Sequence, residues 1–340
     1  MSHPPIHHPG VWRGSDFAGK DAIAFDLTAR QVTILEDATA RVQGQDLQSI
    51  RREDFPLPGL AEDLARVRDT VLHGRGIALL RGFPAAAHDA DFMTRLFWGL
   101  GTHLGKAVSQ SLMGDRLGHV VDVSGENPHE RGYRSRKALD FHTDSDNIVA
   151  MLCLQQAREG GESLFASALS VHNEILARDP ELLDFLYRGF RYHWRGEEAP
   201  GEPPVTDYRV PVFSRCGEDV SCVFLRRHLE LAADAEGPPL TERERQALDL
   251  LEDIAAREDV LLRFRLEPGE GYLINNYTVL HARTGFADGA AAGQRRHLLR
   301  LWLKVPEGRQ LVEPVRRFYR DDGISPRTGG NTLYVPDNLD

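Results

Sequence analysis

The amino-acid sequence predicts a single, mainly β domain with flanking helices, of the sandwich or jelly-roll type. From residue 118 onward, about nine short apolar or alternating runs follow one another with turn residues between them, as is typical of strands. A few amphipathic helices interrupt these runs, and no internal repeat or glycine/serine linker divides the 340 residues. Helices in this order can cover one face of a strand-rich core.

The first part of the chain contains two predicted helices around one strand. Residues 59–76 carry apolar side chains at helical spacing, and Gly74 ends this helix. The continuous apolar run 77–83 follows as a buried strand, and residues 89–105 form the second helix.

The rest of the chain is predicted to be mostly strands. The short apolar or alternating runs occupy residues 118–124, 147–157, 163–167, 190–194, 208–213, 220–225, 260–268, 271–282 and 297–305. Two further helices are expected at 170–187 and 241–259, and the latter begins with a capping box formed by Thr241 and Glu244.

Composition excludes several classes of protein. A net charge of −10 and a pI near 5.8 argue against nucleic acid or an anionic membrane as the main partner, although a few local arginines still allow a small anionic ligand. The three cysteines form no zinc-type CxxC pair and no disulfide framework. No run typical of a signal peptide or a membrane span is recognised, nor a phosphate- or dinucleotide-binding glycine motif. A cytoplasmic, globular protein is therefore expected, and a homo-oligomer is compatible with the sequence.

The stretch "DFHTDSDN", residues 140–147, contains a candidate pair of metal ligands. In an extended chain the side chains of His142 and Asp144 point to the same side, while Thr143 points away. His281 lies at the end of a long apolar run and supplies a third possible ligand. Two imidazoles and one carboxylate are the ligands of non-haem iron(II) oxygenases. The simpler alternative is an ordinary polar turn, because this stretch is rich in turn-forming residues.

The stretch "RRHLLRLWLKVP" contains two arginines that a strand would place on one face. Arg296 and Arg300 lie four residues apart and alternate with apolar residues that belong to the core. Arginines on an alternating strand usually face solvent. The alternative is a polar interior, where two planar guanidinium groups could bind two different anions.

Taken together and in this order, "FHTD", "GGESLFAS", "LHARTGF" and "RRHLLRLWLK" resemble the taurine dioxygenase (TauD/TfdA) family of Fe(II)- and 2-oxoglutarate-dependent oxygenases. The wider clavaminate-synthase-like group is similar too. The resemblance covers about residues 75–306, so residues 1–340 are expected to form one oxygenase domain with terminal extensions. It implies a double-stranded β-helix (jelly-roll) core.

The resemblance also implies roles for individual residues. His142, Asp144 and His281 match the iron ligands. Arg296 lies 296 − 281 = 15 residues after the distal histidine and matches the arginine that binds the far carboxylate of 2-oxoglutarate. Arg295 competes for this role, but it would point to the apolar face of the strand. Two further positions match: Ser163 that of a residue assisting this arginine, and Arg300 that of an arginine binding the anionic group of the primary substrate.

The implied activity is oxidation, most simply hydroxylation, of a small anionic substrate such as an amino acid or related carboxylate. Fe(II), 2-oxoglutarate and O2 would be required, and succinate and CO2 would be formed. Asp144 stands where related halogenases have glycine or alanine, which argues against halogenation. Two alternatives stay open. One is a jelly-roll metalloenzyme that does not use 2-oxoglutarate, and the other is a non-catalytic jelly roll that binds a small molecule.

Overall fold

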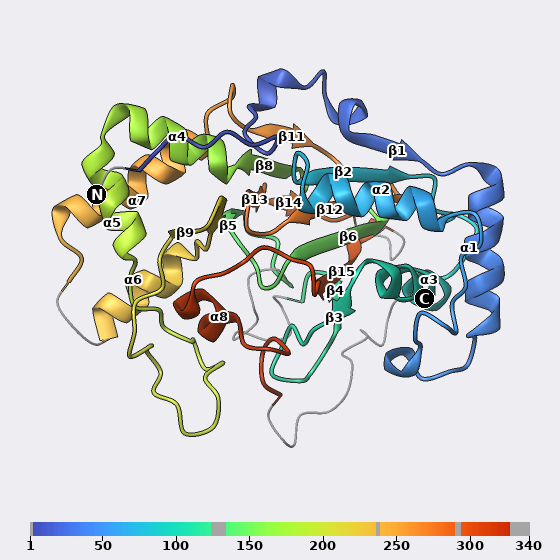
Figure 1. Ribbon diagram of the computed structural model, residues 1–340. Coiled ribbons are helices and arrows are strands. Elements are labelled where there is room, and N and C mark those ends of the chain that lie inside the picture. The colour runs from blue at the N-terminus through green and yellow to red at the C-terminus, as the bar shows by residue number, and fades with distance from the viewer. Residues whose placement is uncertain (1–2, 124–133, 236–238, 290–293, 327–340) are drawn as a thin grey trace.

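A seven-stranded sheet forms the centre of the computed structural model, which describes residues 3–123, 134–235, 239–289 and 294–326 (Figure 1). Its strand order is β1-β2-β12-β6-β15-β3, with β4 also paired to β15. The strands are β1 (Ala24–Asp26), β2 (Ile77–Arg81), β3 (Lys106–Ala107), β4 (Leu117–Val120), β6 (Ile148–Gln155), β12 (Glu270–Asn275) and β15 (His297–Lys304). All pairs except β1 with β2 are antiparallel.

A second, four-stranded sheet lies against the first and has the order β11-β8-β13-β5. Its strands are β5 (Leu139–His142), β8 (Ser163–Ser167), β11 (Leu262–Phe264) and β13 (Val279–Arg283). Two short antiparallel pairs complete the strands, namely β7 (Glu159–Gly160) with β14 (Phe286–Ala287) and β9 (Phe213–Cys216) with β10 (Asp219–Cys222).

Helices cover the outer faces of both sheets (Figure 1). The helices α1 (Ala29–Arg41), α2 (Ala61–Leu72) and α3 (Ala90–Leu104) pack on the seven-stranded sheet. The smaller sheet is covered by α4 (Ala168–Arg178), α5 (Pro180–Arg188) and α7 (Glu242–Ala255). The remaining helices are α6 (Arg226–Ala235) and α8 (Glu313–Tyr319). No helix among the described residues is long and apolar enough to cross a membrane.

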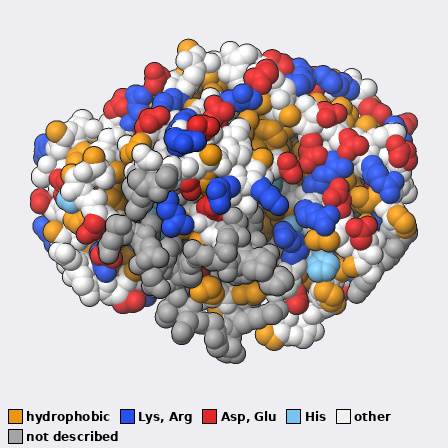
Figure 2. Space-filling view, turned by 180° about the vertical axis from the view of Figure 1, so that it is seen from behind, with side chains coloured by type: hydrophobic (Ala, Val, Ile, Leu, Met, Phe, Trp, Pro, Cys, Tyr) orange, Lys and Arg blue, Asp and Glu red, His pale blue; other side chains and the backbone are white. Residues whose placement is uncertain are grey.

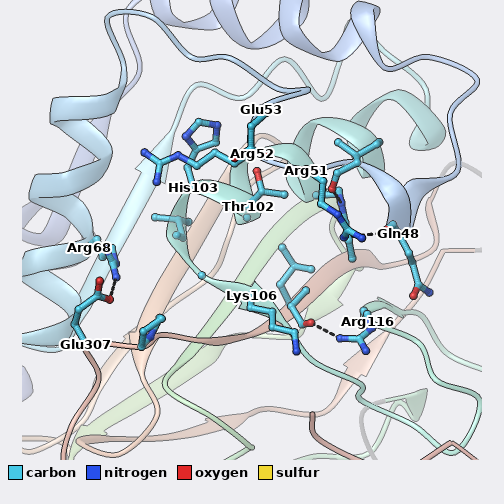
Figure 3. A pocket seen from close by; sticks show the side chains of 18 residues that line it. Gln48, Arg51, Arg52, Glu53, Arg68, Thr102, His103, Lys106, Arg116 and Glu307 are labelled. Atoms are coloured by element: carbon cyan, nitrogen blue, oxygen red, sulfur yellow. Dashed lines mark hydrogen bonds and ion pairs between the residues drawn. The ribbon is translucent and has the colours of Figure 1, made fainter. Parts of the chain in front are cut away.

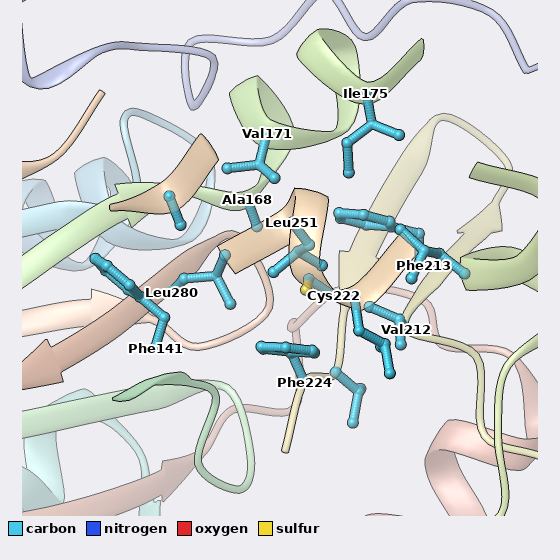
Figure 4. Close-up of a cluster of buried hydrophobic side chains, with 14 of the residues drawn as sticks. Phe141, Ala168, Val171, Ile175, Val212, Phe213, Cys222, Phe224, Leu251 and Leu280 are labelled. Carbon is cyan, nitrogen blue, oxygen red and sulfur yellow. The ribbon is translucent and has the colours of Figure 1, made fainter. Parts of the chain in front are cut away.

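Three buried clusters correspond to these layers. The cluster between the two sheets includes Val149 and Met151 of β6 and Phe165 of β8. Alternate residues of β6, such as Ala150 and Leu152, point instead to the cluster under α3. Because β6 is buried on both faces, its sequence is continuously apolar rather than alternating. The third cluster lies under α4 and α7 and includes the Cys222 side chain (Figure 4).

Several sequence expectations are wrong in detail. The run 271–282 is two strands, because the chain turns at residues 276–278 and passes from the large sheet into the small one. The helix expected at 170–187 is broken into α4 and α5 by Pro180, whose ring is incompatible with a helix interior. Residues 190–194 and 208–213 contribute isolated bridges and only the first residue of β9. The strand expected at 118–124 is shorter, because β4 ends at Val120, and residue 124 lies outside the described residues.

A buried histidine pair beside β15 makes the stability of the fold depend on pH. His119 Nδ1 and His297 Nε2 are 2.9 Å apart, and burial lowers the pKa of His119 from 6.5 to about 4 and that of His297 to about 3. Below pH 6.5 the unfolded chain therefore takes up these protons first. We expect the free energy of unfolding to fall between pH 6.5 and about 4, by up to about 1.4 kcal/mol per pH unit for each histidine.

Urea denaturation across this pH range measures that slope. The double variant His119→Leu/His297→Leu should have a shallower slope than the wild type, whatever its absolute stability. Equal slopes in the two proteins would contradict this account.

Candidate active site

Three predicted ligand side chains converge at one end of the small sheet. The ligand atoms of His142, Asp144 and His281 all lie within 4.8 Å of one another. The two imidazole rings are 4.3 Å apart, and the nearest Asp144 oxygens lie 3.9 Å from His142 Nε2 and 3.5 Å from His281 Nε2. These three form the only such group of three or more ligand residues in the described part of the chain.

Strand pairing brings the two histidines together. His142 ends β5 and lies directly opposite His281 of the antiparallel strand β13. Cross-strand partners point to the same face of a sheet, so both imidazoles face the space between the sheets. His142 Nδ1 lies 2.8 Å from its own strand's Asp140 carbonyl oxygen. If His142 donates this bond, Nε2 is left to act as a ligand.

Asp144 lies just beyond the end of β5, and its backbone is hydrogen-bonded to the Asn276 side chain. Its N–H donates to Asn276 Oδ1 at 2.7 Å, and the Asn276 amide donates to the Asp144 carbonyl at 2.9 Å. Asn276 belongs to the turn where the chain passes between the two sheets. Asp146, two residues on, has a positive φ of 65°, which turns the chain into β6.

The Asp144 carboxylate receives two further hydrogen bonds from β15. Trp302 Nε1 donates to Oδ2 at 3.0 Å, and Arg300 Nη1 donates to the same oxygen at 3.3 Å. Burial alone would raise the pKa of Asp144, but the Arg300 charge and the His281 hydrogen bond bring this pKa well below its usual value. Burial and the charge of His281 lower the pKa of His142 to about 4. The triad is thus a carboxylate beside a neutral His142, as metal binding requires.

Arg296 is a buried residue that lines a cavity beside the triad. The cavity has a volume of about 50 Å³ and is lined by all three triad residues together with Ser163, Arg283, Arg296 and Arg300. The Arg296 side chain is only 2% exposed, and its Nε and Nη1 have no hydrogen-bond partner among the described residues. A buried cation with unsatisfied donors calls for an anion, because leaving such a group unpaired is costly.

Gly161 makes room for this guanidinium group. Its φ is +72°, and a Cβ at this position would lie 3.0 Å from Arg296 Nε. The pattern "GGES", which alone indicated a tight turn, therefore also serves the cavity. Ser163 lies opposite Arg283 in the pairing of β8 with β13 and lines the same cavity as Arg296.

Arg300 of β15 and Arg296, which directly precedes this strand, lie inside the molecule. Arg296 and Arg300 are 2% and 5% exposed, and Leu298 and Trp302 of the same face belong to the cluster between the sheets. The solvent-facing interpretation of this strand is therefore wrong, and the polar interior is the correct alternative. Arg295 turns the other way and donates to the Asp122 carbonyl.

Three residues that support the site were not predicted from the sequence. Gln110 accepts a hydrogen bond from Arg300 Nε at 2.7 Å and thereby fixes the guanidinium plane. Trp302 and Asn276 bond Asp144, as described above. An amide in a turn and an indole on an apolar strand are common in any core, so their types carry no specific signal.

Two more cavities open from the triad. One, of about 220 Å³, is lined by His142, Asp144 and Arg300 on one side and by Arg195 and the first residues of α6 on the other. The second, of about 70 Å³, reaches from Asp144 to an aromatic group comprising Trp194, Trp302, Phe318 and Tyr319. Three cavities therefore adjoin the triad, and one of them is lined by Arg296.

A larger groove of about 640 Å³ lies away from the triad, beside α3 and β3 (Figure 3). Most of its cations already have partners, since Arg68 pairs with Glu307, and Lys106 and Arg116 pair with Asp322. Size alone therefore does not identify the site of chemistry. Basic side chains also gather across the middle of one molecular face, although the net charge is −10 (Figure 2).

Sequence comparison finds relatives along most of the chain. Residues 39–302 match the family described as taurine catabolism dioxygenase TauD, TfdA family. The FR-33289 synthase of Streptomyces rubellomurinus is 33% identical over 314 residues, which cover 90% of this chain and 92% of that protein. A taurine hydroxylase-like protein of Stachybotrys chartarum is 27% identical and is covered over 77% of its length.

Solved structures share the fold at low sequence identity. An asparagine oxygenase in complex with Fe(II), 3-hydroxyasparagine and succinate has a TM-score of 0.65 and 19% identity, over 89% of this chain and 99% of that one. The non-heme iron oxygenase OrfP in complex with Fe and alpha-ketoglutaric acid has a TM-score of 0.60 and 14% identity, over 83% and 93% of the two chains. With its match to the family over residues 39–302, this chain belongs to the TauD, TfdA family and is an Fe(II)- and 2-oxoglutarate-dependent dioxygenase.

Proposed function

We propose that His142, Asp144 and His281 hold the Fe(II), that Arg296 binds the far carboxylate of 2-oxoglutarate with Ser163 beside it, and that Arg300 binds an anionic group of the primary substrate. The observation that carries the proposal is one shared cavity, in which three ligand atoms within 4.8 Å adjoin a buried guanidinium with unsatisfied donors. A 2-His-1-carboxylate triad leaves positions open for a chelating cosubstrate and dioxygen.

The proposed reaction is hydroxylation of a small carboxylate, in the first instance an amino acid. Bound Fe(II) and 2-oxoglutarate supply the oxidative chemistry, in which 2-oxoglutarate is converted to succinate and CO2 and one oxygen atom enters the substrate. The protein orients the reactants. Arg296 fixes the far end of the cosubstrate, and the low pKa of Asp144 keeps this ligand ionised. An amino-acid substrate is consistent with the asparagine oxygenase and with an OrfP complex that contains hydroxylated arginine.

The fold and location complete the proposal. We infer a double-stranded β-helix core within one oxygenase domain, residues 1–340, because the chain passes repeatedly between two facing sheets. A cytoplasmic enzyme fits the three cysteines, all of which are free thiols, since free thiols are typical of reducing compartments.

Anaerobic titration tests the function directly. Fe(II) followed by 2-oxoglutarate should give the visible charge-transfer band of the chelate, and oxygen with a suitable substrate should then release succinate. Absence of both signals would contradict the proposal and favour a metalloenzyme that does not use 2-oxoglutarate.

The Trp302 indole is expected to support iron binding through Asp144. Trp302→Phe removes the 3.0 Å hydrogen bond to Oδ2 and keeps most of the ring, so Asp144 should be less well oriented. Loss of an outer-shell hydrogen bond typically weakens metal binding 10- to 100-fold, and we expect about tenfold here. Metal titration under anaerobic conditions measures the change.

Trp98→Phe is the matched control, because Trp98 is also buried and its Nε1 donates to the Ile50 carbonyl, far from the triad. If both variants weaken iron binding equally, the effect comes from general loosening of the core.

A further inference from the structure

The 220 Å³ cavity beside the triad has cationic side chains at both ends. Arg300 lies at the inner end, next to Asp144, while Arg195, Arg226 and Arg227 line the outer end. The only acidic residues among its lining are Asp140 and Asp144. The protein as a whole is acidic, with a net charge of −10. A cluster of arginines at one cavity is therefore a local feature that the overall charge does not explain.

Arg226 has a structural explanation. Its guanidinium makes ion pairs with three carboxylates, those of Glu230, Asp249 and Glu252, at 2.5 to 2.8 Å. It thereby fastens the start of α6 to α7. The charge of Arg226 is therefore neutralised within the protein. Its role at the cavity is to position the neighbouring residues Arg227 and His228.

Arg227 and Arg195 are exposed residues that line the cavity, and they are not neutralised in this way. Arg227 has one distant carboxylate, Glu230, at 3.9 Å. The Arg195 side chain has no hydrogen bond or ion pair to any described residue, and its backbone φ of +57° is one that favours glycine or asparagine. An arginine is therefore present at a position where the backbone alone would select a different residue.

The helix α6 places its N-terminal end at the cavity. It begins at Arg226, and its first turn contains no acidic residue. The N-terminal end of a helix carries partial positive charge and exposed N–H groups, which favour an anion nearby. The start of α6 and Arg195 line the same cavity as the triad residues His142 and Asp144.

We propose that Arg195 and Arg227 bind a second anionic group of the primary substrate. The substrate class is then a small molecule with two anionic groups. Arg300 receives one group beside the triad, and the outer arginines receive the other, which can be a carboxylate, sulfonate, phosphate or phosphonate. This inference rests on the proposed function and specifies its substrate.

The first experiment compares matched acids. Succinate release is measured with wild-type enzyme, Fe(II), 2-oxoglutarate and oxygen, using amino acids and simple acids in pairs that differ only in a second acidic group. The second acidic group in the panel is a carboxylate, a sulfonate, a phosphate or a phosphonate. Comparing these compounds shows which kind of anion the enzyme accepts. We expect release above background only with acids that carry two anionic groups.

Variants locate the effect. The double variant Arg195→Gln/Arg227→Gln should raise KM for these acids about tenfold or more, as expected for loss of charge-assisted hydrogen bonds. The 2-oxoglutarate titration band should stay unchanged. Arg245→Gln on α7 is the matched control, because it removes one exposed arginine whose nearest carboxylate, Glu242, is 4.0 Å away.

Inorganic phosphate is a direct probe of the outer end. Calorimetric titration into the anaerobic Fe(II)–2-oxoglutarate enzyme should detect binding that the double variant loses and Arg245→Gln retains. Equal turnover of acids with one anionic group, a double variant that behaves like the control, or no phosphate binding by the wild type would each overturn this inference. Loss of the 2-oxoglutarate band in wild-type enzyme would instead overturn the proposed function.

Discussion

Arg296→Gln is expected to raise the dissociation constant for 2-oxoglutarate by about 100-fold or more while iron binding persists. The Arg296 side chain is 2% exposed, and its Nε and Nη1 lack partners among the described residues. Removing one partner of a buried charge pair typically costs about 3–5 kcal/mol, and each 1.4 kcal/mol is a factor of ten. Anaerobic titration of the Fe(II) enzyme with 2-oxoglutarate measures the shift as a weaker visible band.

Arg295→Gln provides a closely matched control. It removes the same charge one residue away, but the Arg295 guanidinium points to the opposite side and donates to the Asp122 carbonyl. Its titration curve should resemble that of the wild type. Equal defects in both variants, or none in Arg296→Gln, would mean that the cosubstrate does not use the buried guanidinium.

His142→Ala is expected to abolish both stoichiometric iron binding and succinate release. Changes behind a metal ligand already weaken metal binding up to about 100-fold, so loss of a ligand should exceed that. Iron content after anaerobic reconstitution and desalting measures the effect. A cooperative thermal unfolding transition of the metal-free His142→Ala protein would show that the variant is still folded.

His73→Ala serves as the comparison, since His73 is exposed at the end of α2. It should retain full iron content. A His142→Ala protein that binds one iron per chain would exclude this histidine as a ligand, whatever its activity.

Local geometry predicted that the His142 and Asp144 side chains lie together, and the structure places His281 beside them. The roles of these residues and of Arg296 come from the family resemblance and stay predictions. Alternation continued back from β15 predicted that Arg295 and Arg296 point to different sides, and in the structure Arg296 is buried while Arg295 donates to the Asp122 carbonyl. Alternation could not decide which face of β15 was buried. That depends on the second sheet, which packs against this face through residues far away in the chain.

The supporting residues could not be predicted for a related reason. Asn276 reaches Asp144 because the chain leaves the large sheet at residues 276–278, whereas the apolar run 271–282 looked like one continuous strand. A change of sheet within an apolar run leaves no change in hydrophobic period. Gln110 and Trp302 reach the site only through tertiary packing, which has no signature in local sequence.

With the proposed ligands, the direct pairing of β5 with β13 would also make the stability of the fold depend on bound iron. His142 and His281 come from parts of the chain 139 residues apart, and they are held opposite each other by strand pairing. An ion bound to both would act as a clip that closes a very long loop. At a free iron concentration 100 times its dissociation constant, such binding adds about 2.7 kcal/mol to the folded state. Without iron the enzyme would therefore be both inactive and less stable toward unfolding.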